Sequence, residues 1–153
     1  MDNCRLIELT SHGDNRGSLI ALEKEHDVPF DIKRVFYIYD TKRGTPRGQH
    51  ANKKSEQMLI CVSGSCRVKV DNGKGMQEVY ELNTPEQALY TGTMLWREMY
   101  DFSGGCVLMV IASEYYNPEE YIRDYDKYIE LVNGGGDIGK CIFILLLMLK
   151  VKI

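Results

Sequence analysis

The feature that most constrains this chain is a regular succession of short runs rich in β-branched and aromatic residues, each ended by a turn signal. The runs recur at about ten-residue spacing, which is typical of an all-β sandwich or barrel. The Gly-containing stretch 71–75 is a strong hairpin signal between two of them, and 41–48 is expected to be a polar loop. The predicted strands are 4–9, 17–22, 32–39, 56–62, 66–70, 77–82, 88–91 and 106–113.

A helix signal appears only late in the chain. Asn117 can cap a helix that begins at Pro118, with two acidic residues in its first turn. Apolar side chains then recur at helical spacing between residues 121 and 129. The sequence therefore predicts one short C-terminal helix that packs on the β domain.

The C-terminal segment differs in composition from the rest of the chain. Residues 133–137 form a Gly-rich break, and nine consecutive apolar residues follow at 141–149. Such a run is too short to span a bilayer, because a membrane-spanning helix needs about twenty apolar residues. We therefore expect a folded domain over 1–132 and an appendage of unknown role over 133–153.

Composition and charge weigh against several functional classes. A hydrophobic fraction of 44% and a charged fraction of 27% are typical of a globular protein. The net charge of −3 disfavours a general nucleic-acid binder, whereas an anionic small ligand needs only a local basic cluster. The N-terminal stretch lacks the apolar core of a signal peptide, and no transmembrane run is expected. Five cysteines without a C-x-x-C pair argue against a disulfide scaffold and favour the reducing cytoplasm.

The most informative polar cluster surrounds His50. Its spacing resembles the first motif of metal cupins, G-x5-H-x-H-x4-E-x6-G, in which the ligands point into a barrel because strand side chains alternate. The corresponding residues here are Gly44, His50, Asn52, Gln57 and Gly64.

Metal cupins hold their metal with the two histidines and the glutamate of this motif and one histidine of a second motif. In this chain three of these four positions carry other residues. Asn52 and Gln57 are neutral amides, which are poor ligands for zinc, iron or manganese. Arg97 falls at the histidine position of the second motif, where a fixed cation repels a metal. We therefore expect no metal and no cofactor. His50 alone in the cavity suggests acid–base chemistry or plain binding, since imidazole titrates near neutral pH.

Longer strings make the comparison more specific. They lie at 13–19, 29–38, 47–51, 57–65, 96–103, 112–116 and 121–125. Together they closely resemble the WxcM-like cupins and, more narrowly, the sugar 3,4-ketoisomerases (dTDP-4-oxo-6-deoxy-D-glucose 3,4-oxoisomerases). The resemblance covers roughly residues 5–130 and stops before the apolar tail.

This resemblance implies an all-β cupin fold, a metal-free jelly-roll barrel, here with a short C-terminal helix. It also implies a homodimer with exchanged N-terminal strands and a role in making dTDP-linked 3-amino sugars. The usual family motif is R-G-x-H-A-H-K, and this chain departs from it at Asn52, where the second histidine would stand.

The implied reaction moves a ketone from C4 to C3 of a nucleotide-linked sugar through an enediolate. It needs a base, a donor to the enediolate oxygen and cations for the diphosphate. His50 is the expected base, and the expected donors are Tyr37, Asn52 or Gln57. The other binding candidates are the cations Arg16, Arg34, Arg47, Lys53 and Arg97, the aromatic residues Phe36, Trp96 and Tyr100, and Glu98.

Each assignment has a structural alternative. Tyr37 is about as well explained by core packing, because the sequence does not tell which face of its strand is inside. Arg16 can be a solvated turn residue, Arg97 and Glu98 can pair with each other, and the amides can satisfy buried polar groups.

The stereochemistry at C4 follows from the number of proton donors. A single base that takes the C3 proton and returns it on the same face gives the galacto configuration, dTDP-3-oxo-6-deoxy-D-galactose. With Asn52 in place of a titratable imidazole, we expect that product. The main alternative function is a catalytically degenerate nucleotide-sugar-binding cupin. A dTDP-sugar 3,5-epimerase and a metal-dependent dioxygenase fit the residues less well.

Overall fold

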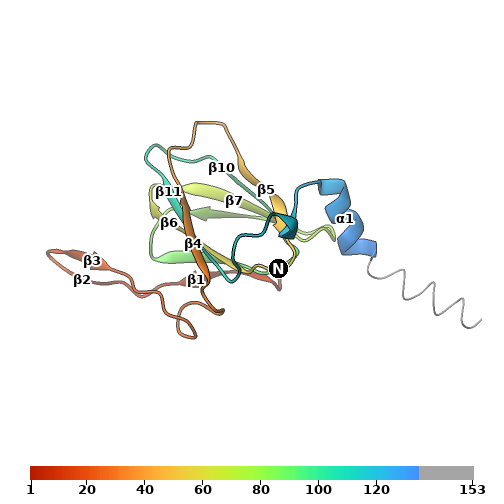
Figure 1. Cartoon of the computed structure of the whole chain (residues 1–153). Helices are drawn as coiled ribbons and strands as arrows, with labels where there is room; N and C mark the ends of the chain where they lie inside the picture. Colours follow the sequence, from red (N-terminus) through yellow and green to blue (C-terminus); the bar gives the residue numbers. More distant parts are fainter. Residues whose placement is uncertain (135–153) are drawn as a thin grey trace, which may run out of the picture.

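The structure is a computed structural model that describes residues 1–134 of the 153-residue chain. Two five-stranded antiparallel sheets face each other (Figure 1). The first sheet contains, in spatial order, β1 (Cys4–Glu8), β9 (Gln87–Thr91), β6 (Gln57–Ser63), β11 (Val107–Ala112) and β4 (Arg34–Ile38). The second contains β12 (Tyr121–Ile122), β5 (Arg47–Asn52), β10 (Trp96–Tyr100), β7 (Cys66–Asp71) and β8 (Gln77–Leu82).

Most connections cross from one sheet to the other. The chain passes from β4 to β5, β6 and β7 by changing sheets at each step, and again from β8 to β11. This alternation is the double-sheet arrangement of a jelly roll. The predicted all-β cupin class, with one short C-terminal helix, is confirmed.

The sequence analysis did not predict the two strands that carry His50 and Arg97. β5 begins at Arg47, inside the expected loop, and β10 covers 96–100, where no strand was predicted. Both lack the usual alternation of apolar and polar residues, because their inward positions carry His50, Asn52 and Arg97. The polar residues of the site therefore remove the alternating pattern from which these two strands could have been predicted.

The interior of the barrel is apolar away from this site. Side chains from both sheets, among them Leu59, Val68 and Leu108, form the main buried cluster. A second cluster lies on the outer face of the first sheet, where Val28 and Phe30 from the segment after β3 cover it. These two clusters bury both faces of β6, which explains its continuous apolar sequence.

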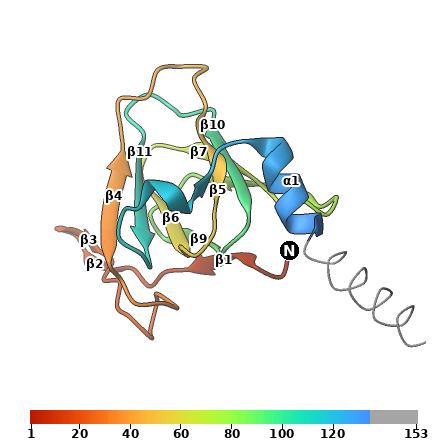
Figure 2. The ribbon, with the colours of Figure 1, turned by 45° about the vertical axis from the view of Figure 1, so that its right-hand side comes forward.

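The predicted helix begins later than expected. Asn117 caps only a short 3-10 turn, η1 (Pro118–Glu120), by accepting a hydrogen bond from the Glu119 backbone N–H. The chain then pairs with β5 as β12, so the α-helix α1 begins at Tyr125. Tyr128 is fully buried where α1 packs beside β5 and β10 (Figure 2), as the helical pattern predicted.

The helix also extends into the expected Gly-rich break. α1 (Tyr125–Gly134) includes Asn133, whose side chain donates to the Gly73 carbonyl across the domain. The apolar run 141–149 and the remainder of the expected appendage lie outside the described residues. Within the described part of the chain, no helix is both long and apolar enough to cross a membrane.

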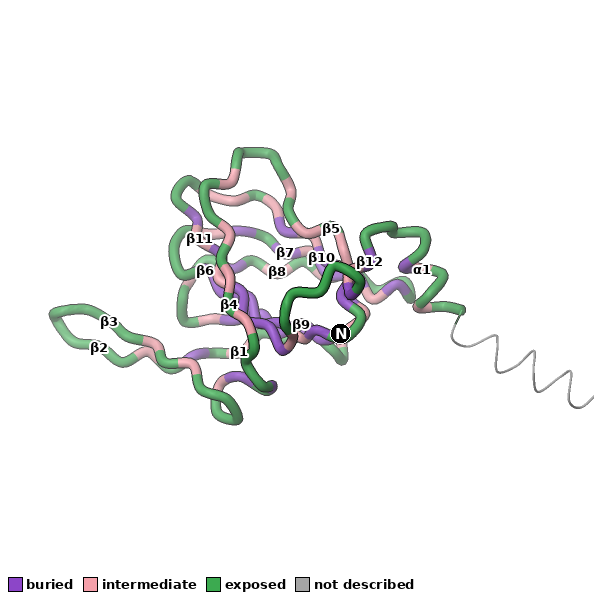
Figure 3. The backbone as a smooth tube through the Cα atoms, viewed as in Figure 1, coloured by how far each residue is buried: buried purple, intermediate pink, exposed green. Residues whose placement is uncertain are grey.

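A hairpin formed by β2 (His12–Asp14) and β3 (Gly17–Leu19) projects from the barrel. Its six strand residues are all exposed, as Figure 3 shows in green. The sequence analysis expected one longer strand over 17–22 and no strand over 12–14. Instead the chain folds back at Asn15 and Arg16, and the hairpin pairs with no other described strand.

Candidate active site

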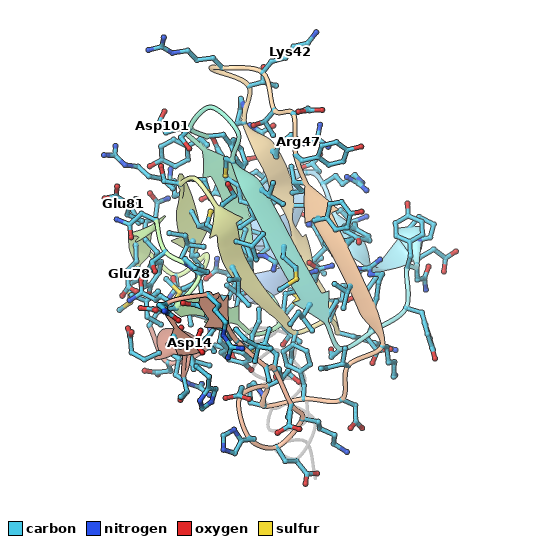
Figure 4. All side chains as sticks on the ribbon, turned by 90° about the vertical axis from the view of Figure 1, so that its left-hand side faces the viewer. Asp14, Lys42, Arg47, Glu78, Glu81 and Asp101 are labelled. Carbon is cyan, nitrogen blue, oxygen red and sulfur yellow. The ribbon has the colours of Figure 1, made fainter. Side chains whose placement is uncertain are left out.

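A cavity of about 510 Å³ lies between β4, β5 and β10 at one end of the barrel. Its walls include His50, Gln57 and Arg97 from three different strands. Figure 4 shows Arg47 at the same end of the barrel as Lys42, whereas Asp14 of the projecting hairpin lies toward the other end. Phe36 and Leu59 supply apolar walls. The cavity is of the size that a small ligand requires.

A β-bulge on β5 positions His50. His50 pairs with Arg97 of β10, while the next pairing along joins Gly48 to Glu98 and leaves Gln49 without a partner. Gly48 adopts a φ of +89°, and a Cβ there would lie 2.6 Å from the Met99 side chain. Only glycine fits this backbone and this close approach. The Gly-before-His string therefore has a structural cause.

The hydrogen bonds of His50 fix its tautomer. Its Nδ1 lies 3.0 Å from the Gly48 carbonyl oxygen, which can only accept, so Nδ1 carries the proton and Nε2 carries the lone pair. Burial lowers the pKa of His50 from 6.5 to about 4, with a smaller effect from Arg97. His50 is therefore neutral at pH 7 and presents a free base at Nε2.

Arg97 is a buried cation held by neutral groups. Only 2% of it is exposed, and its Nη1 donates to Gln57 Oε1 at 2.7 Å and to Thr91 Oγ1 at 2.8 Å. Its Nη2 donates to Asn52 Oδ1. Burial lowers the pKa of Arg97 to about 10, which leaves it charged at neutral pH. No carboxylate forms an ion pair with it among the described residues.

Two cavity residues were missed by the sequence analysis. The Tyr121 ring meets the His50 ring edge-on at 4.8 Å, and the Tyr121 hydroxyl accepts a hydrogen bond from Arg34. Arg123 lies over the other part of the Tyr121 ring and lines the cavity. Both were read as part of a helix, although the family string 121–125 contained them. That string was the signal that could have identified them.

Several predicted residues do gather at the cavity. Gln57, Arg47 and Arg97 line it together with His50. Arg34 lies beside it, over the Phe36 ring.

Other predicted residues lie behind or beside the cavity wall. Asn52 is completely buried, its Oδ1 accepts a hydrogen bond from Arg97, and it is not among the residues that line the cavity. Lys53 points outward and donates to the Glu119 carbonyl. Tyr37 borders the cavity, but it is 64% exposed because it alternates with inward-facing Phe36 and Ile38.

Trp96, Glu98 and Tyr100 lie on the opposite face of β10 from Arg97 and Met99, which are buried. The Trp96 ring packs against Tyr125 and Tyr128 of α1. Alternation along one strand thus separates these three residues from His50. Trp96 and Glu98 instead border a shallower hollow outside the barrel, which adjoins the cavity through Gly48 and Arg123.

Arg16 does not reach His50 within one chain. It sits at the tip of the β2–β3 hairpin, with 85% of its side chain exposed, and its Nε lies 2.9 Å from Asp14 Oδ2. The predicted contact with substrate therefore requires another copy of the chain.

The barrel and this cavity define a class: a cupin-fold protein with one neutral histidine base beside a buried cation. A family model for FdtA, WxcM-like, C-terminal, matches residues 2–133. The chain therefore belongs to the WxcM-like FdtA family, as the sequence strings indicated.

Relatives of known activity agree with this membership. The chain is 54% identical to the TDP-4-oxo-6-deoxy-α-D-glucose-3,4-oxoisomerase of Aneurinibacillus thermoaerophilus, over 87% of this chain and 96% of that protein. A 3,4-ketoisomerase structure from Helicobacter canadensis matches with a TM-score of 0.83 and 47% identity, over 86% and 98% of the two chains. A mutant of the 3,4-ketoisomerase QdtA from Thermoanaerobacterium thermosaccharolyticum, in complex with TDP-4-keto-6-deoxyglucose, matches with a TM-score of 0.84 and 42% identity, over 88% and 96%.

Proposed function

We propose that this protein is a sugar-nucleotide 3,4-ketoisomerase that converts TDP-4-oxo-6-deoxy-D-glucose into a TDP-3-oxo-6-deoxyhexose. The observation that carries the proposal is one cavity in which the free Nε2 of His50 lies beside the uncompensated charge of Arg97. The 54% identity to a TDP-4-oxo-6-deoxy-α-D-glucose-3,4-oxoisomerase supports the substrate.

The chemistry moves two protons and leaves the overall oxidation state unchanged. His50 Nε2 takes the proton from C3, and the electron pair passes into the C4 carbonyl, whose oxygen is protonated as the C3 hydroxyl gives up its proton, to form the enediolate. The imidazolium then returns a proton to C4, which leaves a ketone at C3 and a hydroxyl at C4. The charge that develops on the enediolate oxygens needs a fixed donor, and Arg97 and Gln57 line the same cavity as His50.

The diphosphate needs cations at the mouth of the cavity. Arg47 and Arg123 line the cavity, and Arg34 lies close by at Tyr121. Guanidinium groups match phosphate oxygens in a bidentate manner, so these three are the proposed diphosphate ligands. The outer hollow with Trp96 and Glu98 continues from Arg123 and is the proposed path for the nucleoside.

We further propose a homodimer with exchanged N-terminal hairpins. The β2–β3 hairpin is fully exposed in its own chain, and β4 is an edge strand whose outer residues Val35 and Tyr37 are exposed. A hairpin from a second copy would cover that edge. Such an exchange would also bring Arg16 to the partner's cavity and give Tyr37 a covered position beside the substrate.

For the product, we propose the galacto configuration at C4. His50 works from one face of the sugar, so the same imidazole returns its proton to that face. The Tyr121 hydroxyl is the competing donor, because the two rings are in contact. The relatives include both a TDP-quinovose and a TDP-fucose 3,4-ketoisomerase from Campylobacter jejuni, at 49% and 38% identity, so overall similarity does not choose between the two configurations.

The setting follows from the chemistry. The 3-oxo product suits a transaminase that makes a 3-amino sugar, so we propose a place in dTDP-3-amino-sugar biosynthesis. We propose the cytoplasm as the location, where the thiols of Cys4, Cys61, Cys66 and Cys106 would stay reduced.

Turnover and binding together test the proposal. Purified protein treated with a chelator is mixed with TDP-4-oxo-6-deoxy-D-glucose, and the sugar is followed by proton NMR beside a His50→Asn control. We expect formation of a 3-oxo sugar by the wild type alone, with TDP binding retained in both. Binding without turnover in the wild type would instead identify a degenerate nucleotide-sugar-binding cupin.

A further inference from the structure

The two lost metal-ligand positions of the first cupin motif both contact the residue at the third lost position, Arg97. Asn52 stands where the motif has its second histidine, and Gln57 stands where it has glutamate. Their amide oxygens accept hydrogen bonds from Nη2 and Nη1 of Arg97. The head group of Arg97 therefore lies between the residues that would hold a metal in a metal cupin.

The groups that hold Arg97 carry no charge. Besides the two amides, only the Thr91 hydroxyl contacts the guanidinium within the described part of the chain. The nearest buried acid, Glu120, accepts hydrogen bonds from the backbone N–H groups of Lys54 and Ser55 instead. A glutamate at position 57 or an aspartate at position 52 would neutralise the guanidinium, whereas amides fix its position and leave its charge intact.

The cavity itself supplies no compensating carboxylate. The groups facing His50 are Arg97 from β10, Tyr121 from β12, Arg123 just after it, Arg47 on its own strand and Tyr37 from β4. Beyond the cavity lining, the Cys4 thiol of β1 and the Glu120 carboxyl of η1 are near enough to oppose the lowering of the Arg97 pKa by burial. The described cavity lining thus combines three cations with no anion, and Arg97 is the most deeply buried of them.

We propose that Asn52 and Gln57 are positioning residues that hold Arg97 without neutralising it, so that its guanidinium replaces the metal of other cupins. The fixed charge acts together with burial to keep His50 unprotonated before substrate binds, and it stabilises the enediolate oxygen during turnover. The stabilisation of the enediolate rests on the proposed isomerase function, whereas the effect of the Arg97 charge on His50 does not. Asn52 is then a replacement for the family histidine as acceptor, rather than a lost proton relay.

The test introduces a carboxylate of nearly the same shape. In Asn52→Asp and in Gln57→Glu, an anion faces Arg97, and the opposing field on His50 is cancelled. We expect the pKa of His50, read from its ring carbon shift by NMR without substrate, to rise by about one unit or more in both variants. Asn83→Asp makes the same chemical change on an exposed loop and should leave that pKa unchanged.

Kinetics test whether Arg97 stabilises the enediolate. We expect kcat to fall by at least about tenfold in both carboxylate variants with KM little changed, because the lost interaction is made mainly in the transition state. A His50 pKa that stays at the wild-type value in two folded variants would overturn the proposal. A raised pKa with unchanged kcat would overturn the role in stabilising the enediolate. Because the NMR titration needs no substrate, its outcome is independent of whether the protein is an isomerase.

Discussion

The protonation of His50 gives the sharpest quantitative prediction. Its pKa is lowered from 6.5 to about 4, first by burial and then by the charge of Arg97, while the hydrogen bond to Gly48 opposes the shift. The unfolded chain has neither the burial nor the fixed neighbour. Folding therefore excludes a proton from this imidazole across the window between the two pKa values.

The sign of the effect on stability follows from that exclusion. Below pH 6.5 the unfolded state binds a proton that the folded state lacks, so acidification favours unfolding. The stabilising contribution is complete above pH 6.5 and is lost as the pH falls toward 4. A single group with these two pKa values lowers the free energy of unfolding by about 2 kcal/mol between pH 7 and pH 5.

Urea unfolding at both pH values measures this difference. The wild type should lose about 2 kcal/mol more than His50→Gln on going from pH 7 to pH 5, because the variant has no titrating group at this position. The kcat/KM of the wild type should stay flat from pH 8 to pH 5, since the base remains neutral. Equal pH dependence of the two proteins, or a break in kcat/KM near pH 6.5, would show that folding does not lower the pKa of His50.

Four substitutions or deletions test other parts of the site. Gly48→Ala forces a positive φ and a contact with Met99, so the Tm should fall by roughly 4–8 °C and turnover should drop; an unchanged Tm in calorimetry would contradict the bulge. Arg97→Met should reduce kcat by about 10²-fold. It should also lower the urea midpoint, because three buried acceptors lose the guanidinium as their donor. A wild-type kcat in a steady-state assay would contradict the proposed role of Arg97. Tyr121→Phe should cost less than about tenfold in kcat and leave the C4 configuration unchanged by NMR, whereas a switch of configuration would identify Tyr121 as the acid that protonates C4. Removal of residues 12–19 should convert a dimer to a monomer by light scattering, and a retained dimer would exclude exchange of this hairpin.

The sequence predicted the fold wherever strands were amphipathic or apolar. β6, β7, β8, β9 and β11 were found close to their observed bounds, since their buried faces give a clear pattern. β5 and β10 were missed because the site replaces their inward apolar residues with His50, Asn52 and Arg97. The polar residues of the site thus removed the alternation of apolar and polar residues on which strand prediction depends.

The residues predicted for the centre of the site lie together in the structure, whereas several of the others lie outside the cavity. His50, Gln57, Arg47 and Arg97 share one cavity, because motif spacing along three strands encodes their common direction. Trp96, one residue from Arg97, faces the other way, and adjacency in sequence could not reveal this. Arg16, at the exposed tip of the β2–β3 hairpin, is not among the residues that line this cavity.

The sequence analysis missed Tyr121 as a cavity residue for a different reason. The residues after Pro118 carry a helical pattern of apolar side chains, yet two of them pair with β5 before the helix begins. Tertiary pairing thus overrode the local preference. Only the longer family string placed this tyrosine near the catalytic motif.

Isomerisation in D2O tests directly whether the protein is a 3,4-ketoisomerase with His50 as its base. TDP-4-oxo-6-deoxy-D-glucose is incubated with the chelated wild type or with His50→Asn, and the sugar is followed by proton NMR. With the wild type we expect a 3-oxo product, with deuterium at C4 in those turnovers in which the proton on His50 exchanges with solvent before it is returned, and with the variant we expect neither conversion nor exchange at C3. Conversion by His50→Asn at the wild-type rate would contradict the assignment of His50 as the base, and a wild type that neither converts nor exchanges its substrate would contradict the assignment of the protein as an isomerase.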